Sequence, residues 1–178
     1  MHIDVSKVPI PPMMNSRPRD RRGLPIPYFQ YIPPNFENDR VVDFRVTDPE
    51  RRIECLTKKL CGLCGEPLLR TFAFIGGPLS RESRVFSDPP SHENCAKYAM
   101  KVCPFLAIPS YKVGETIKAT RDGYEVITDA MGVAERPPQM FLYITDGFEM
   151  VRVRDGNTGE IHPMIYALAN DHKRVEEF

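Results

Sequence analysis

The sequence of 178 residues contains no tryptophan, no excess of either charge and no long apolar run. Its 24 Lys and Arg balance 24 Asp and Glu, so the chain as a whole has no net attraction for nucleic acids or acidic membranes. No segment approaches the ~18 apolar residues that a membrane-spanning helix needs. The first residues also lack the charged and apolar regions of a signal peptide. These absences predict a soluble cytoplasmic protein with one modest core.

Glycine is scarce beside proline, with 11 glycines and 18 prolines, which disfavours a helical bundle. Eight of the prolines fall in residues 1–40, and proline fixes φ and removes a backbone donor. We therefore expect this segment to be an arm without long regular structure. Apolar side chains recur along the arm at Ile10, Leu24, Ile26 and Phe29. This recurrence predicts that the arm packs over the folded body.

The five cysteines form an odd number, and an intracellular context disfavours disulfides. Cys61 and Cys64 form a C-x-x-C-G pair, and His92 and Cys95 form an H-x-x-C pair. Zinc prefers four soft or borderline ligands in a tetrahedron, and two pairs with two intervening residues each supply them. The sequence therefore predicts one structural Zn²⁺ ion held by Cys61, Cys64, His92 and Cys95.

The segments around these pairs predict how the ligands are presented. Ser91 is a good N-cap, and a helix from there to Pro104 places the second pair in its first turn. Between the pairs we expect strands at Leu68–Ile75 and Ser83–Phe86, joined by a turn at Gly76–Pro78. A knuckle, a hairpin and a helix in this order outline a treble-clef zinc unit.

Two alternatives to this ligand set remain open. Cys61 and Cys64 could be a redox pair, with Cys95 an unrelated buried residue. A thioredoxin-like pair should open a helix, however, and the Gly-Glu-Pro that follows Cys64 disfavours one. Cys103 could replace a ligand, but it lies eight residues beyond Cys95. A buried apolar role fits Cys103 better, as it does Cys55.

Local signals place further elements around the zinc unit. The sequence Asp48-Pro49-Glu50 supplies a cap, a proline at the first helical position and an acid in the first turn. It predicts a helix from Pro49 to about Lys59. We also expect a strand at Val41–Val46 and a closing helix with a charged end at Ile161–Phe178. Two hairpins are expected around Asp122-Gly123 and Asp146-Gly147. Their strands are Thr116–Thr120 with Tyr124–Thr128, and Phe141–Thr145 with Glu149–Arg154.

Together these elements predict an α+β fold, in which a treble-clef-like zinc ββα unit is joined to a small antiparallel sheet and a proline-rich N-terminal arm. The predicted divisions are the arm at 1–40, the zinc-binding unit at 41–109, and a β region with a C-terminal helix at 110–178.

Catalytic motifs are largely missing. An HNH-type nuclease needs a general-base histidine between or just after the ligand pairs, and none lies between Cys64 and Ser91. Such an enzyme would have to recruit His2, His162 or His172. The order of the pairs does not fit a zinc deaminase, and there is no P-loop or nucleophile elbow. A site with four protein ligands is closed, which favours structural zinc and no catalysis.

Basic side chains cluster in the first half of the chain, while acidic ones are concentrated toward the C-terminus. Together with the arm's aromatic residues, the basic ones could form a positive face that binds nucleic acid. The alternative is an ordinary solvated surface in which acidic side chains are interspersed. The candidate residues are Arg17, Arg19, Arg21, Arg22, Arg51, Arg52, Arg81 and Arg84.

Four strings of residues 8–110 form a recognisable pattern: PPMMNSRPRDRRGLPIPYF, CGLCGEPL, AFIGGPLS and FSDPPSHENCAKYAMKVCPFL. Through these strings, residues 8–110 resemble small uncharacterised proteins of bacteria and their phages. The resemblance implies a zinc-bearing protein of phage or bacterial origin and brings no activity and no catalytic residues.

The sequence thus favours an intracellular structural-zinc module that binds nucleic acid or a nucleic-acid-processing protein. The alternatives are a protein-binding adaptor or inhibitor of a host enzyme, and a divergent HNH-like nuclease.

Overall fold

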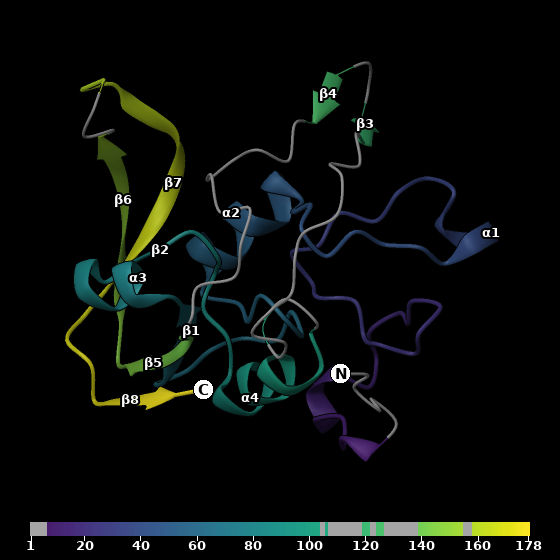
Figure 1. Ribbon diagram of the computed structural model, residues 1–178, viewed down its shortest axis with the longest axis horizontal. Helices are drawn as coiled ribbons and strands as arrows, with labels where there is room; N and C mark the ends of the chain where they lie inside the picture. Colours follow the sequence, from purple (N-terminus) through teal and green to yellow (C-terminus); the bar gives the residue numbers. More distant parts are fainter. Residues whose placement is uncertain (1–6, 104–105, 107–118, 122–123, 127–138, 155–157) are drawn as a thin grey trace.

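The computed structural model describes residues 7–103, 106, 119–121, 124–126, 139–154 and 158–178 (Figure 1). The fold of this part of the chain is mixed α+β, with two antiparallel three-stranded sheets and one two-stranded ribbon. The helices are α1 (Phe36–Asp39), α2 (Pro49–Lys58), α3 (Pro78–Ser83) and α4 (Glu93–Val102), with a 3-10 turn at Pro12–Met14. The strands are β1 (Phe72–Gly76), β2 (Val85–Phe86), β3 (Ala119–Arg121), β4 (Tyr124–Val126), β5 (Phe141–Thr145), β6 (Phe148–Arg154), β7 (Ile161–Ala169) and β8 (Arg174–Glu177).

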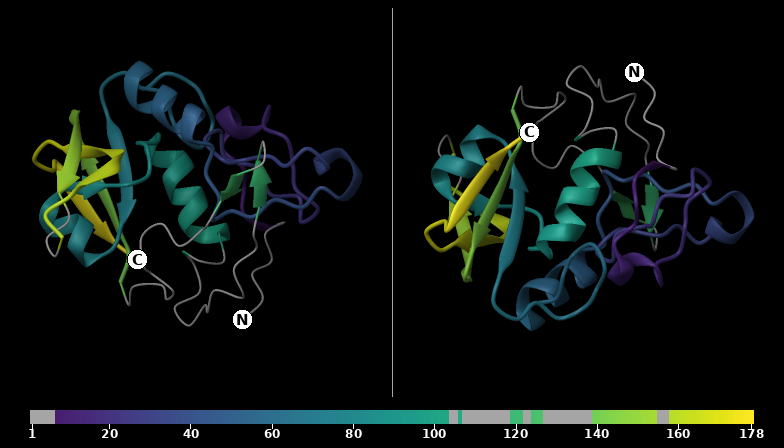
Figure 2. Two further views of the ribbon diagram at one scale, coloured as in Figure 1. Left: turned by 90° about the horizontal axis from the view of Figure 1, so that it is seen from above. Right: turned by 90° about the horizontal axis from the view of Figure 1, so that it is seen from below.

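The two larger sheets lie on one side of the molecule and the arm on the other, with α4 between them (Figure 2). One sheet has the strand order β1-β5-β8 and the other β2-β7-β6. All five residues of the central strand β5 are buried. One face of its sheet packs Leu142 and Ile144 against Ala96 of α4. The sheets therefore position the helix that carries two of the four predicted ligands.

Helix α2 begins at Pro49 and is capped by Asp48, which confirms the helix predicted from Asp48-Pro49-Glu50. The Asp48 side chain accepts hydrogen bonds from the backbone N–H groups of Glu50 and Arg51, and Pro49 is the first helical residue. Cys55 is fully buried on the inner face of this helix, as expected. Helix α2 ends at Lys58, three residues before the first cysteine of the knuckle.

The expected hairpin between the ligand pairs does not form. Strand β1 pairs with β5, whereas β2 pairs with β7, so the two belong to different sheets. The segment read as a turn at Gly76–Pro78 instead leads into α3, with Gly77 at the N-cap and Pro78 in the first turn. Proline at a first helical position is a start signal as well as a turn signal. The ligand arrangement is that of a knuckle and a helix, without the hairpin of a treble clef.

Three other expectations are also wrong. Residues 41–46 form no strand, and Thr47 makes only an isolated bridge to Gln30. β5 and β6 begin and end close to the predicted limits but do not pair with each other. Residues 161–178 form β7 and β8 rather than a helix, because β7 pairs with both β2 and β6.

The hairpin expected around Asp122-Gly123 is confirmed in its described part, where Arg121 lies opposite Tyr124.

The arm contributes buried side chains to the core. Met14, Leu24 and Phe29 belong to the same buried cluster as the three ligand cysteines. Ile26 packs in a smaller cluster with Phe36 and Val42. The boundaries at 40 and 109 between the three expected divisions stay predictions, the second lying outside the described residues.

Among the described residues, no helix is long and apolar enough to cross a membrane.

Candidate metal centre

The first ligand pair sits in a tight knuckle closed by backbone hydrogen bonds. The N–H of Cys61 donates to the Glu66 carbonyl at 2.8 Å, and the N–H of Gly65 donates to the Cys61 carbonyl at 2.8 Å. Leu60 and Pro67 form an isolated bridge across the base of the turn. Gly65 has a φ of 85°, a conformation that favours glycine. The knuckle therefore holds both thiols of the pair on one side of a rigid turn.

The second pair lies at the start of α4. His92 is the N-cap, one residue later than the Ser91 expected from the sequence, and Cys95 is in the first turn. Ser91 exchanges two backbone hydrogen bonds with Ala73 of β1, at 2.8 and 2.9 Å. The N–H of Gly62 donates to the Pro90 carbonyl at 2.8 Å. These bonds dock the segment before His92 onto both the sheet and the knuckle.

The four predicted ligand atoms converge. The Sγ atoms of Cys61, Cys64 and Cys95 and a ring nitrogen of His92 all lie within 4.8 Å of one another. The Cys64 Sγ and His92 Nδ1 atoms are 3.4 Å apart. In a zinc tetrahedron with the usual bond lengths, neighbouring ligand atoms lie about 3.5–3.8 Å apart. The arrangement is consistent with one metal ion at its centre.

Hydrogen bonds around the cluster orient the ligands. His92 Nε2 lies 3.2 Å from the Pro67 carbonyl oxygen, so an N–H on Nε2 donates there and leaves Nδ1 free of a proton for the metal. The backbone N–H groups of Cys64 and His92 point at the Cys61 sulfur, at 3.5 and 3.4 Å. Such donors stabilise a thiolate. The cluster thus has an outer set of partners as well as a ligand set.

The electrostatics of the cluster favour a thiolate at Cys61 and oppose one at Cys64 and Cys95. Burial opposes ionisation of Cys61, but hydrogen bonds from the other two thiols and from the imidazole hold its pKa well below its usual range. Hydrogen bonding to Cys61 and Cys64, together with burial, raises the pKa of Cys95. Hydrogen bonding to Cys61 likewise raises the pKa of His92. A cation that binds the deprotonated thiols displaces the protons they carry, so metal binding at this cluster depends on pH.

The two remaining cysteines lie outside this cluster. Burial raises the pKa of the Cys55 thiol to about 12, so Cys55 is a poor ligand and a poor nucleophile. Cys103 is the C-cap of α4 and is half-buried. Among the described residues, the four predicted ligands are the one group of three or more His, Cys, Asp and Glu placed to hold a metal ion.

The eight candidate arginines do not form one face. Arg81 and Arg84 lie on α3 or at its end, beside the sheets and on the opposite side from the arm (Figure 1). Arg52 is only 3 % exposed and donates to the carbonyls of Ser87 and Ile165, so its guanidinium faces the interior. A positive surface that joined the arm, α2 and α3 is not what this structure presents.

The arginines of the arm have local partners. Arg17 and Arg51 lie on the Tyr28 ring, at 5.3 and 5.4 Å from its centroid. Arg19 donates to the Gly23 carbonyl at 3.5 Å, and Arg21 is exposed. Arg22 forms an ion pair with Asp20 at 2.6 Å. At the other end of the molecule, Arg84 pairs with Asp171 at 2.6 Å.

The sequence did not reveal the ion pairs that join α4, which carries the second ligand pair, to β8. Glu93 lies between the two helical ligands and pairs with Lys97 at 2.8 Å and with Arg174 of β8. Glu176 completes a ring by pairing with Lys97 at 3.1 Å and Arg174 at 2.8 Å. No signal in the sequence could reveal this ring, since its members on α4 and on β8 lie about 80 residues apart. The sequence also predicts a helix where β8 forms.

Comparisons of the chain with protein-family models, with curated proteins and with solved structures return no match.

Proposed function

We propose that the protein is a structural-zinc module that binds nucleic acid, or a nucleic-acid-processing protein, through its N-terminal arm. The observation that supports the structural-zinc part of this proposal is the convergence of three thiols and one imidazole at a single point. Sulfur-rich tetrahedral sites select zinc among the common divalent ions, and four protein ligands leave no position for a substrate. In this proposal the metal stabilises the fold and takes no part in a reaction. Any binding activity resides in side chains on the protein surface.

The arm presents arginines on a rigid loop. Asp20 is 4 % exposed, and its carboxylate accepts hydrogen bonds from the N–H groups of Arg22 and Leu24 at 2.9 and 3.0 Å. Arg19 and Pro25 form a bridge that closes the loop. The N–H of Arg21 donates to the carbonyl of Arg40 at 2.9 Å, which brings two exposed arginines side by side.

The distribution of charge supports a polarised molecule. Residues 7–52 carry nine Lys and Arg against six Asp and Glu, and residues 139–178 carry four against seven. A cationic loop at one end of a neutral chain is suited to contacts with phosphate groups, which supply affinity without reading base sequence. We therefore expect binding with little sequence preference.

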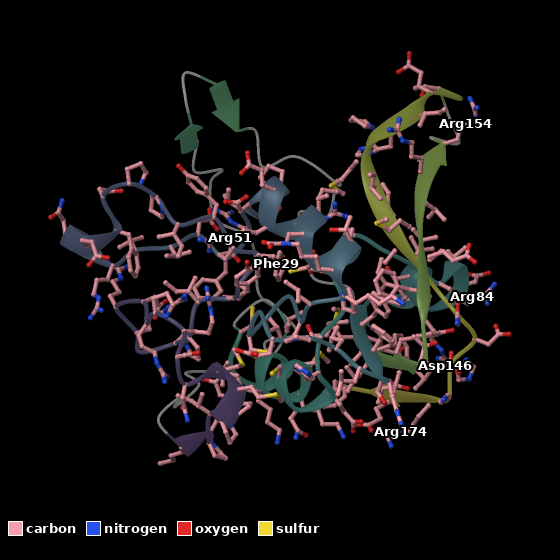
Figure 3. The ribbon with its side chains drawn as sticks, turned by 180° about the vertical axis from the view of Figure 1, so that it is seen from behind. Phe29, Arg51, Arg84, Asp146, Arg154 and Arg174 are labelled. Atoms are coloured by element: carbon pink, nitrogen blue, oxygen red, sulfur yellow. The ribbon has the colours of Figure 1, made fainter. Side chains whose placement is uncertain are left out.

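The test is fluorescence anisotropy of the full-length protein with labelled single-stranded DNA, duplex DNA and RNA over a range of salt concentrations. Binding should weaken steeply with salt, and Arg21→Ala or Arg19→Ala should reduce the slope of log K against log salt by about one each. The matched control is Arg154→Ala, at the far end of the β6–β7 hairpin (Figure 3), which should leave the slope unchanged. Binding that is independent of salt, or equal losses in all three variants, would contradict the proposal.

The two alternatives have less support in the described residues. A nuclease would need a second metal or a poised histidine. His162 Nδ1 lies 3.0 Å from the Tyr166 hydroxyl oxygen, and the described residues hold no second ligand cluster. An adaptor was expected to expose apolar side chains of the arm. Among the described residues, the exposed large apolar side chains lie outside the arm: Leu69, Leu79, Met150, Ile161 and Phe178.

A further inference from the structure

The arm and the metal knuckle are joined by direct backbone hydrogen bonds. The N–H of Tyr28 donates to the Leu63 carbonyl at 3.0 Å, and the N–H of Phe29 donates to the Gly62 carbonyl at 3.1 Å. Gly62 and Leu63 are the two residues between the first pair of ligand cysteines. The carbonyls that receive the arm therefore belong to the same turn that carries the first ligand pair.

Side chains of the arm close over the same turn. The Tyr28 ring lies so near Gly65 that a Cβ atom there would come within 2.7 Å of it. A Cβ atom on Gly62 would meet Pro89 at 2.7 Å and the Phe29 ring at 3.1 Å. Because glycine alone leaves room for these rings, the knuckle and the arm are matched surfaces.

The side chain of Tyr28 also anchors the arm to α2 at this point. The Tyr28 hydroxyl donates to Glu54 of α2 at 2.7 Å, and the ring is flanked by the guanidinium groups of Arg17 and Arg51. Arg51 also donates to the Tyr28 carbonyl at 3.3 Å. The described part of the arm has one four-residue helix and a 3-10 turn, and none of its residues belongs to a sheet. The order of the arm therefore depends on a few contacts such as those of Tyr28, and not on the continuous hydrogen bonding of a β-sheet.

We propose that metal binding and docking of the arm are coupled: the metal-bound knuckle is the surface on which residues 20–31 dock, and the docked arm in turn slows release of the metal. By linkage, whatever free energy the metal adds to arm docking, the arm adds to metal binding. The inference rests on the metal site and is independent of nucleic-acid binding. The arm includes the loop of residues 19–25, which carries Arg19, Arg21 and Arg22. The order of this arm then depends on whether the metal is bound.

The first experiment follows amide hydrogen exchange of the full-length wild-type protein before and after removal of metal by a chelator. The amides of Tyr28 and Phe29 should exchange at least tenfold faster in the chelated protein, while those of Tyr143 and Val151 in the sheets keep their protection. Protection of the arm that survives chelation would overturn the proposal. A uniform loss in arm and sheets would also overturn it, because the metal would then hold the whole fold rather than the arm.

The second experiment tests the reverse direction by measuring the rate at which zinc passes to a chromogenic chelator. Tyr28→Ala removes the anchor without touching a ligand and should speed this transfer about tenfold. Phe148→Ala is the matched control, since Phe148 packs on Phe72 and Phe74 in the sheets, at centroid distances of 5.4 and 5.7 Å. It should change the rate less than twofold. Equal rates in Tyr28→Ala and wild type, or equal acceleration in both variants, would contradict the coupling. The exchange experiment needs no variant, so the proposal can be tested even if Tyr28→Ala does not fold.

Discussion

On the sheet side of the molecule, β5 is bonded along both edges, and β7 is bonded to β6 and β2. On the arm side, residues 7–48 contain one four-residue helix and a 3-10 turn, and their polar groups are satisfied one at a time. Buried Gln30 donates to the carbonyls of Asp43 and Val46, and buried Asp20 closes its own loop. A β-sheet keeps its structure when one of its many hydrogen bonds is removed. A segment held by a few isolated hydrogen bonds loses its position when one of them is removed. The comparison teaches that the position of the arm side depends on its individual cross-links, among them the two backbone hydrogen bonds from Tyr28 and Phe29 to the knuckle.

The sharpest way to break this comparison is to remove a metal ligand. Cys61→Ala or Cys95→Ala should abolish metal binding and unfold the knuckle, since a structural zinc site contributes about 10–16 kcal/mol of binding free energy. Metal content and denaturant unfolding would measure the loss.

The controls are the cysteines outside the cluster. Cys55→Ala and Cys103→Ala should keep the metal and lower the free energy of unfolding by roughly 1–2 kcal/mol through lost packing. If all four variants collapse to the same extent, the ligand set is wrong.

A smaller effect is expected where the two sides meet. Arg52 of α2 donates to the carbonyls of Ser87 and of Ile165 in β7, and it is buried. Arg52→Met removes both charge-assisted hydrogen bonds and should lower the free energy of unfolding by about 2–4 kcal/mol. The exposed Arg70, replaced in the same way, should change it by less than ~0.5 kcal/mol. An Arg52→Met variant as stable as wild type would mean that α2 and β7 do not depend on this link.

The smallest effect concerns the ion-pair ring between α4 and β8. Arg174 is about half exposed, so its pairs with Glu93 and Glu176 are screened by solvent. Arg174→Ala should lower the free energy of unfolding by less than ~1 kcal/mol at low salt, and the difference should disappear at high salt. Chemical denaturation at two ionic strengths measures both. A loss that does not depend on salt would show that the side chain acts by packing instead.

The parts of the fold that the sequence predicted are those encoded locally. The cap and proline at Asp48 and Pro49 define α2 without reference to the rest of the chain. The two ligand pairs could likewise be recognised, because zinc imposes both the residue types and their spacing.

The parts that failed depend on distant partners. β1 and β5 lie about 70 residues apart in the chain, and nothing near Phe72 indicates that its partner is β5 rather than β2. The Asp146-Gly147 signal suggested a hairpin, but β8 already occupies the free edge of β5. Instead, Gly147 accepts a backbone hydrogen bond from Asn170 at 2.9 Å, which directs β6 toward β7. A closing helix was expected from Ile161 to Phe178, but β7 pairs with β2 and β6 and β8 pairs with β5, so this segment forms two strands.

Native mass spectrometry of the full-length protein, purified without added metal, tests the central claim most directly. We predict one zinc ion per chain, lost in Cys95→Ala and retained in Cys103→Ala. A metal-free wild-type chain would contradict the claim, most clearly if its mass were about two daltons low because Cys61 and Cys64 had formed a disulfide.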